Sequence, residues 1–181
     1  MSERINEALL EMYYFRPLRE AIADVYGRNV LKIIKPVPGL EAWVGFDQGY
    51  ARTDLTGDEL VSTLRTTIAA QGTTVPQLHL GFFLQFKVVQ RMVLSSKYMP
   101  PAYDTPYYRS EVSLTPSRTT GISQHETLVR LAAVGGNAVE VYYACPMVFD
   151  RADLWCDPDL ETLQLVPANK APTGWQPSDR H

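Results

Sequence analysis

Two polar side chains interrupt an apolar run, Gly-Phe-Phe-Leu-Gln-Phe-Lys-Val, at residues 81–88. If the run is a β-strand, Gln85 and Lys87 lie on the same face as Phe83, because strand side chains alternate between faces. A lysine in such surroundings costs free energy unless it has a partner. Asp47 is the matching acid upstream, in the sequence Gly-Phe-Asp. The opposite face of the strand carries only apolar residues, namely Phe82, Leu84, Phe86 and Val88.

An acid followed by a Gln-x-Lys pair suits metal-dependent hydrolysis of a phosphodiester. Mg²⁺ (or Mn²⁺) prefers oxygen ligands and retains several waters, so few protein ligands suffice. The expected ligands are the carboxylate of Asp47, the amide oxygen of Gln85 and the backbone carbonyl of Phe86. Lys87 would orient the attacking water or neutralise the phosphate in the transition state. Glu41, six residues before Asp47, would complete the catalytic and metal-binding set.

This layout resembles the restriction-endonuclease-like superfamily, the PD-(D/E)xK nucleases, in the branch where Gln replaces the second acid. The resemblance covers about residues 1–150 and implies a metal-dependent endonuclease that acts on DNA. Proteins of this sort often look like components of bacterial restriction or anti-phage defence systems. Nuclease folds of this size often lack a recognition domain, so a partner protein or a homo-oligomer is expected. The matching segments are Glu41, 45–47, 84–87, 124–128 and 141–146.

Two assignments stay open at this point. No proline stands directly before Asp47, and 38 positions separate it from Gln85, more than the usual spacing of the superfamily. Asp54 and Asp58 are therefore rival carboxylates. The superfamily often adds a glutamate from its first helix, and here Glu7 and Glu11 are both candidates.

The charge distribution suggests a face for phosphate groups. The whole chain carries −3, but residues 87–130 hold six basic and three acidic residues, whereas the rest of the chain beyond residue 130 carries −4. A basic segment between acidic ones fits a local nucleic-acid-binding face. The alternative is that these charges are solvated and that the nearby tyrosines serve packing. The expected backbone contacts are Arg91, Arg109, Arg118 and His125.

The order of elements predicts an α/β fold, a single domain with a central mixed sheet flanked by helices. The domain is expected over 1–166, followed by a Pro-rich polar tail over 167–181, and a long ordered excursion is expected over 95–121. Periodicity predicts helices over 4–26, broken or kinked at Pro17, over 57–70, and from Ser123 to Gly135-Gly136. Strands are expected over 30–34, 41–46, 81–88, 138–145 and 162–166.

Other classes of protein find less support. No apolar run reaches the roughly 18 residues that a membrane span needs, and the charged N-terminus does not resemble a signal peptide, so a cytoplasmic protein is expected. Cys145 and Cys156 lack zinc-site spacing. No phosphate-binding or nucleophile-elbow motif points to a small-molecule enzyme. The principal rival is a catalytically silent nuclease fold that binds nucleic acid or serves assembly.

Overall fold

The computed structural model describes residues 5–72, 74–94, 99, 104–134 and 136–171. Its centre is a five-stranded sheet in the order β1-β2-β3-β6-β7. The β3–β6 pair is parallel and the other three pairs are antiparallel, so the sheet is mixed. The strands are β1 (Leu31–Ile34), β2 (Gln48–Thr53), β3 (Leu78–Phe86), β6 (Val139–Pro146) and β7 (Leu163–Pro167).

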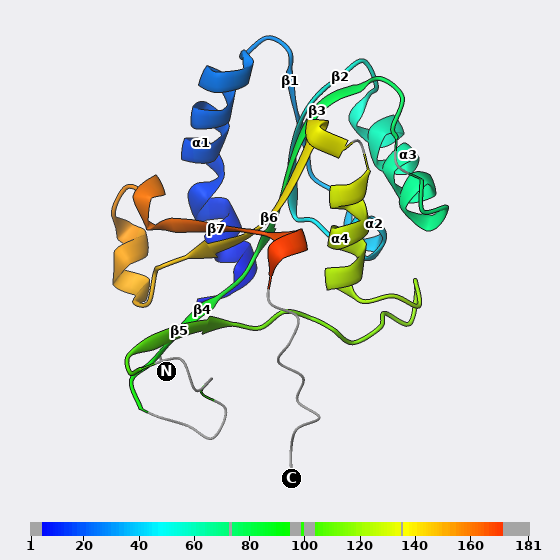
Figure 1. Cartoon of the computed structure of the whole chain (residues 1–181). Coiled ribbons are helices and arrows are strands. Elements are labelled where there is room, and N and C mark those ends of the chain that lie inside the picture. The colour runs from blue at the N-terminus through cyan, green and yellow to red at the C-terminus, as the bar shows by residue number, and fades with distance from the viewer. Residues whose placement is uncertain (1–4, 73, 95–98, 100–103, 135, 172–181) are drawn as a thin grey trace.

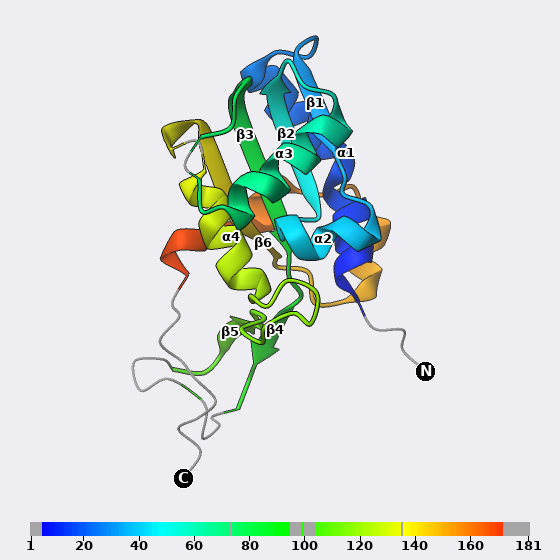
Figure 2. The ribbon, with the colours of Figure 1, turned by 90° about the vertical axis from the view of Figure 1, so that its right-hand side faces the viewer.

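Helices cover both faces of this sheet, which confirms the predicted α/β class. Helix α1 (Glu7–Tyr26) lies on one face, and α2 (Pro38–Val44), α3 (Gly57–Ala69) and α4 (Gln124–Ala133) lie on the other (Figures 1 and 2). The two faces of β3 serve two cores, because Leu84 packs with α1 residues such as Tyr14 whereas Phe83 packs with α3 and α4 residues such as Leu64 and Leu128. The alternation read from the sequence of β3 is therefore confirmed.

Helix α1 runs without a break through Pro17. Asn6 caps its start by accepting a hydrogen bond from the backbone N–H of Leu9 at 2.9 Å, and Gly27 ends it at φ 97°. The predicted break is wrong because the helix buries a continuous apolar face against the sheet, and this burial offsets the hydrogen bond that proline removes. The buried apolar residues of this face are Leu10, Tyr14, Leu18, Ile22 and Ala23.

The strand predicted over 41–46 is also wrong, because this segment belongs to helix α2. Pro38 stands at the first helical turn, where its fixed φ and missing N–H are tolerated. Gly45 ends the helix in the left-handed conformation at φ 79° and donates its N–H to the carbonyl of Glu41. As a result Asp47 lies just before strand β2 rather than at the end of a strand.

The remaining predicted elements are present with shifts of one to three residues at their ends. Thr56 and Glu59 form a capping box at the start of α3, and Ser123 caps α4 by accepting a hydrogen bond from the N–H of Glu126.

Ala168 is buried against α4 and β6, so packing continues past residue 166 into η4 (Ala168–Lys170). Asp150 caps a short helical turn, η2 (Arg151–Trp155). Two further short turns are η1 (Gly136–Ala138) and η3 (Leu160–Thr162).

A two-stranded ribbon extends beyond the end of the main sheet (Figures 1 and 2). It pairs β4 (Val89–Met92) with β5 (Tyr107–Ser110) in antiparallel register. The sequence pattern indicated neither strand. Tyr98 and Tyr103, on which the expectation of an ordered excursion depended, lie outside the described residues.

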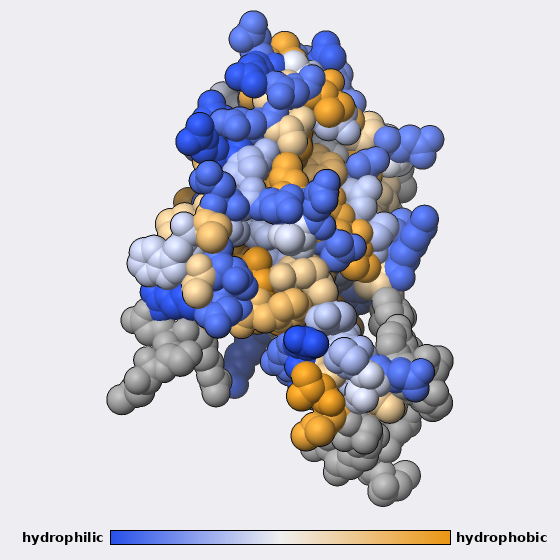
Figure 3. Space-filling view, turned by 90° about the vertical axis from the view of Figure 1, so that its left-hand side faces the viewer, coloured by the Kyte–Doolittle hydropathy of each residue, from blue (hydrophilic) through white to orange (hydrophobic). Residues whose placement is uncertain are grey.

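None of the helices described here is long and apolar enough to span a membrane. On the face that carries α1, hydrophilic residues lie between apolar patches (Figure 3).

Candidate functional site

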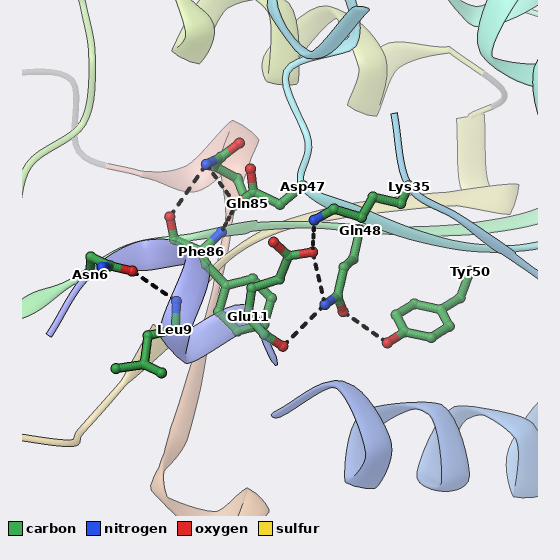
Figure 4. Close-up of polar contacts among 9 residues, drawn as sticks. All are labelled: Asn6, Leu9, Glu11, Lys35, Asp47, Gln48, Tyr50, Gln85 and Phe86. Atoms are coloured by element: carbon green, nitrogen blue, oxygen red, sulfur yellow. Dashed lines mark hydrogen bonds and ion pairs between the residues drawn. The ribbon is translucent and has the colours of Figure 1, made fainter. Parts of the chain in front are cut away.

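The site forms where the β2–β3 ladder ends. The last pair of this ladder is Gln48 with Leu84, so Phe86 lies beyond it. The carboxylate of Asp47 takes the place of the missing strand, and its Oδ2 accepts the backbone N–H of Phe86 at 2.8 Å. The same oxygen accepts the side-chain amide of Gln85 at 2.9 Å, and this amide also reaches the Phe86 carbonyl at 3.3 Å (Figure 4). Asp47 and Gln85 are therefore in direct contact.

Lys87 is held between two helices at this end of the sheet. Only 5% of the residue is exposed. Its Nζ lies 3.0 Å from Oε1 of Glu7 in α1 and 3.3 Å from Oε1 of Gln124 in α4. The amide of Gln124 in turn donates to Oε1 of Gln85 at 2.8 Å. One hydrogen-bonded chain thus links Asp47, Gln85, Gln124, Lys87 and Glu7.

Glu11 anchors a second polar group, one helical turn after Glu7. Its Oε1 pairs with Lys35 and accepts the side-chain amide of Gln48 at 3.1 Å. Tyr50 donates to Oε1 of Gln48 at 2.9 Å, which extends the group into the core beneath α1. Figure 4 shows the carboxylate of Glu11 between Lys35 and Gln48, on the side of the site next to Asp47.

Both glutamates act on the ionisation of Asp47. The pKa of the Asp47 carboxyl is raised to about 6, chiefly by burial and also by repulsion from Glu11 and Glu7. The hydrogen bond from Phe86 and the charge of Lys87 lower this pKa but do not cancel the effect of burial. The positive charge around Asp47 is therefore too small to offset the cost of its ionised form. A divalent cation bound beside it would supply the missing positive charge.

The donor set meets part of the requirement for a magnesium ion. Within the described ranges, no group of three His, Cys, Asp or Glu side chains is placed to hold a metal. An ion with one or two carboxylates, a neutral oxygen, waters and phosphate oxygens still fits. The side-chain NH₂ group of Gln85 faces Asp47. Rotation of this amide group by 180° would turn its oxygen toward Asp47 instead. The residues that suit such an ion are Asp47, Gln85, Glu11 and, through its carbonyl, Phe86.

Three other acids stand apart from this group. Glu41 lies in the first turn of α2, makes no hydrogen bond or ion pair with Asp47 among the described residues and is not among the charges that shift its pKa. The structure therefore records no contact that would join Glu41 to the site. Asp54 faces His79 at 3.1 Å, and Asp58 lies in the first turn of α3. Of the three aspartates considered, Asp47 is the one that contacts Gln85.

The expected phosphate contacts fall into two groups. Arg91 and Arg118 are exposed, and Arg109 is half-exposed with its Nε donating to Oε1 of Gln90 at 3.0 Å. His125, by contrast, is buried, and its Nδ1 lies 2.8 Å from the hydroxyl of Tyr143. Burial lowers the pKa of His125, so it is neutral at pH 7. This placement favours a packing role for His125 over contact with a phosphate.

Comparison of the chain with protein-family models, curated proteins and solved structures gives no match.

Proposed function

We propose that the chain is a Mg²⁺-dependent endonuclease of the restriction-endonuclease-like kind, hydrolysing phosphodiester bonds of DNA. One observation carries the proposal: a buried lysine, Lys87, is joined through Gln124 and Gln85 to a partly buried aspartate, Asp47, of raised pKa. A buried lysine linked to an aspartate of raised pKa, at the end of a sheet, is more typical of a site that acts on phosphate than of side chains that only pack.

Asp47, Gln85 and the Phe86 carbonyl would hold the metal, and Lys87 would meet the scissile phosphate. When bound, Mg²⁺ would supply positive charge to the phosphate and promote deprotonation of water. Lys87 adds a charge that is fixed before the substrate arrives, because Gln124 and Glu7 already orient its ammonium group. The proposal depends on displacement of Glu7 or Gln124 by a phosphate oxygen.

The contacts of the two glutamates of α1 suggest different roles. Glu11 is nearly buried and held through Oε1 by Lys35 and Gln48, and its charge is the larger carboxylate influence on Asp47. Glu7 is half-exposed and already pairs with Lys87. We therefore assign Glu11 as the second carboxylate near the metal and Glu7 as the resting partner of Lys87.

The resemblance extends the proposal to biological context. A cytoplasmic component of a prokaryotic anti-phage defence system, acting with a partner protein or as a homo-oligomer, is the setting that it implies. Glu41 has no role in this proposal, because its contacts do not connect it to Asp47.

A cleavage assay on the purified chain tests the proposed function. Plasmid, linear duplex and single-stranded DNA are incubated with Mg²⁺, with Mn²⁺, or with EDTA. We expect cutting that requires the metal and stops on chelation. Cutting that continues in EDTA would contradict the metal-dependent mechanism.

A catalytically silent nuclease fold is the second candidate. One observation favours it: Asp47 already has its Oδ2 occupied by two protein donors, and the described residues offer no three-acid metal group. DNA binding without cutting, under every metal condition and in the presence of a partner, would select this candidate.

The basic residues of the ribbon and the following loop lead to a binding prediction. Arg109→Ala and Arg118→Ala should each weaken DNA binding on all sequences alike, since they remove phosphate contacts. The slope of log affinity against log salt should become shallower by about 1 for each lost contact. Fluorescence anisotropy across a salt series measures this slope.

Arg16→Ala is the matched control, because Arg16 is an exposed arginine of α1 paired with Glu20. It should leave the slope unchanged. Affinity that stays constant from low to high salt in the wild type would exclude this face as a phosphate-binding surface.

A further inference from the structure

Two exposed aromatic rings lie stacked beside the β4–β5 ribbon. The ring centroids of Tyr108, in β5, and Phe149, after β6, are 5.4 Å apart with 25° between the planes. The residues are 46% and 42% exposed. Exposed aromatic pairs leave apolar area in water, so their presence on a surface calls for a ligand that covers them.

Positive charge accompanies these rings. Arg91 stands directly opposite Tyr108 in the antiparallel register, so the two side chains share one face of the ribbon. Arg91 is exposed. An arginine beside an exposed aromatic platform is the combination by which proteins hold single-stranded nucleic acid, with the cation on the phosphate and the ring on the base.

The rings lie within reach of a strand bound at the candidate site. Strand β4 begins two residues after Lys87, and Arg91 follows Lys87 by four residues. Four residues of extended chain span about 13 Å. This is the greatest reach of the backbone from Lys87 to Arg91, the residue opposite Tyr108, so a strand of a few nucleotides would extend from the candidate site to the rings.

We propose that Tyr108 and Phe149 form a stacking site for an unpaired nucleobase, so that the substrate is single-stranded or locally unpaired nucleic acid. This inference rests on the proposed nuclease function and specifies its substrate. Bases inside a duplex already stack on each other and offer no free ring face, whereas an unpaired base does. Aliphatic residues are also exposed at the end of β4, where Val93 is 61% and Leu94 76% exposed, so a protein partner is the competing occupant.

Binding measurements on matched oligonucleotides test the stacking site. Fluorescence anisotropy in EDTA, which prevents cutting, compares a short single strand, its duplex and the same single strand carrying abasic positions. Tyr108→Ala should weaken binding of the normal single strand by about fivefold to a hundredfold and leave duplex binding nearly unchanged. Tyr108→Phe should retain the wild-type affinity. The abasic strand should bind the wild type as weakly as the normal strand binds Tyr108→Ala.

Two controls separate stacking from loss of structure. Trp155→Ala removes a different aromatic residue, 85% exposed on η2, and should not change affinity. Phe149→Ala should reproduce the effect of Tyr108→Ala, and thermal melts of all variants check that they fold. Equal affinity of wild type and Tyr108→Ala for the normal single strand would overturn the inference and leave the rings to a protein partner. Absence of any single-strand binding would also overturn it.

The outcomes also distinguish this inference from the proposed function. Base-dependent binding without cutting in Mg²⁺ would retain the stacking site and reject the nuclease. Cutting in Mg²⁺ with no effect of Tyr108→Ala on single-strand affinity would retain the nuclease and reject the stacking site.

Discussion

Replacing Lys87 by alanine is expected to reduce Mg²⁺-dependent cleavage by about 100-fold or more. Glu7 and Gln124 hold the ammonium group of Lys87 at the site, and once a phosphate oxygen replaces one of them, this charge stabilises the charge that develops on the phosphate. The loss should appear in the rate at saturating substrate, because a group that acts on the transition state contributes to kcat. Single-turnover cleavage of a labelled DNA strand measures it.

Lys170→Ala is the matched control, because Lys170 is an exposed lysine of η4 and has no place in the site. The partner that Lys87→Ala leaves behind, Glu7, is half-exposed and can be hydrated, so the variant should remain folded. Circular dichroism and a thermal melt check this point. Equal cutting rates for wild type and folded Lys87→Ala would reject Lys87 as a catalytic residue.

The face of β3 that carries Gln85 was predictable from the sequence, because it depends on simple alternation. The pattern of β3 placed Gln85 and Lys87 on the face of Phe83, and the structure has Phe83 packed toward α4 and Gln85 bonded to Gln124 of that helix. The capping residues likewise located the starts of α3 and α4, because side-chain caps act over three or four positions.

Helix α2 was missed for a local reason. The segment 41–46, which includes the last turn of this helix, is apolar enough to resemble a strand. The helix begins at Pro38 and is ended by Gly45 in the left-handed conformation. Because a strand was expected over 41–46, Glu41 was expected close to Asp47. A proline followed seven residues later by glycine was the signal that could have located the helix.

The polar group around Glu11 was not accessible from sequence. Lys35, Gln48 and Tyr50 come together with Glu11 only because α1 packs across β2 and β3, which follow Glu11 in the chain by more than 30 residues. Gln124 was part of a recognised segment, but its bonds to Gln85 and Lys87 depend on how α4 meets the end of β3. Such contacts depend on long-range packing, which the hydrophobic periodicity of the sequence does not reveal.

Asp47→Asn is expected to make the metal-free protein more stable at pH 7 while abolishing cleavage. The substitution keeps the shape of the side chain and an oxygen for the N–H of Phe86, and removes a charge that burial, Glu11 and Glu7 all disfavour. A pKa raised from 3.8 to about 6 corresponds to at most about 3 kcal/mol, and partial exposure reduces the expected gain to about 1–2 kcal/mol. Urea unfolding in EDTA measures the difference.

The pH dependence of this difference identifies its origin. In the folded wild type, Asp47 retains its proton up to about pH 6, whereas in the unfolded chain it loses it near pH 4. Between these values the folded state binds more protons, so its stability falls as pH rises and then levels off above pH 6. The Asn variant should lack this decline, and the two proteins should be equally stable near pH 4. Mg²⁺ should raise the unfolding midpoint of the wild type but not of the variant, because a ligand that binds only the folded state stabilises it. A stability difference that stays constant from pH 4 to pH 8, or an equal Mg²⁺ effect on both proteins, would contradict the role of Asp47 as the metal-binding carboxylate of raised pKa.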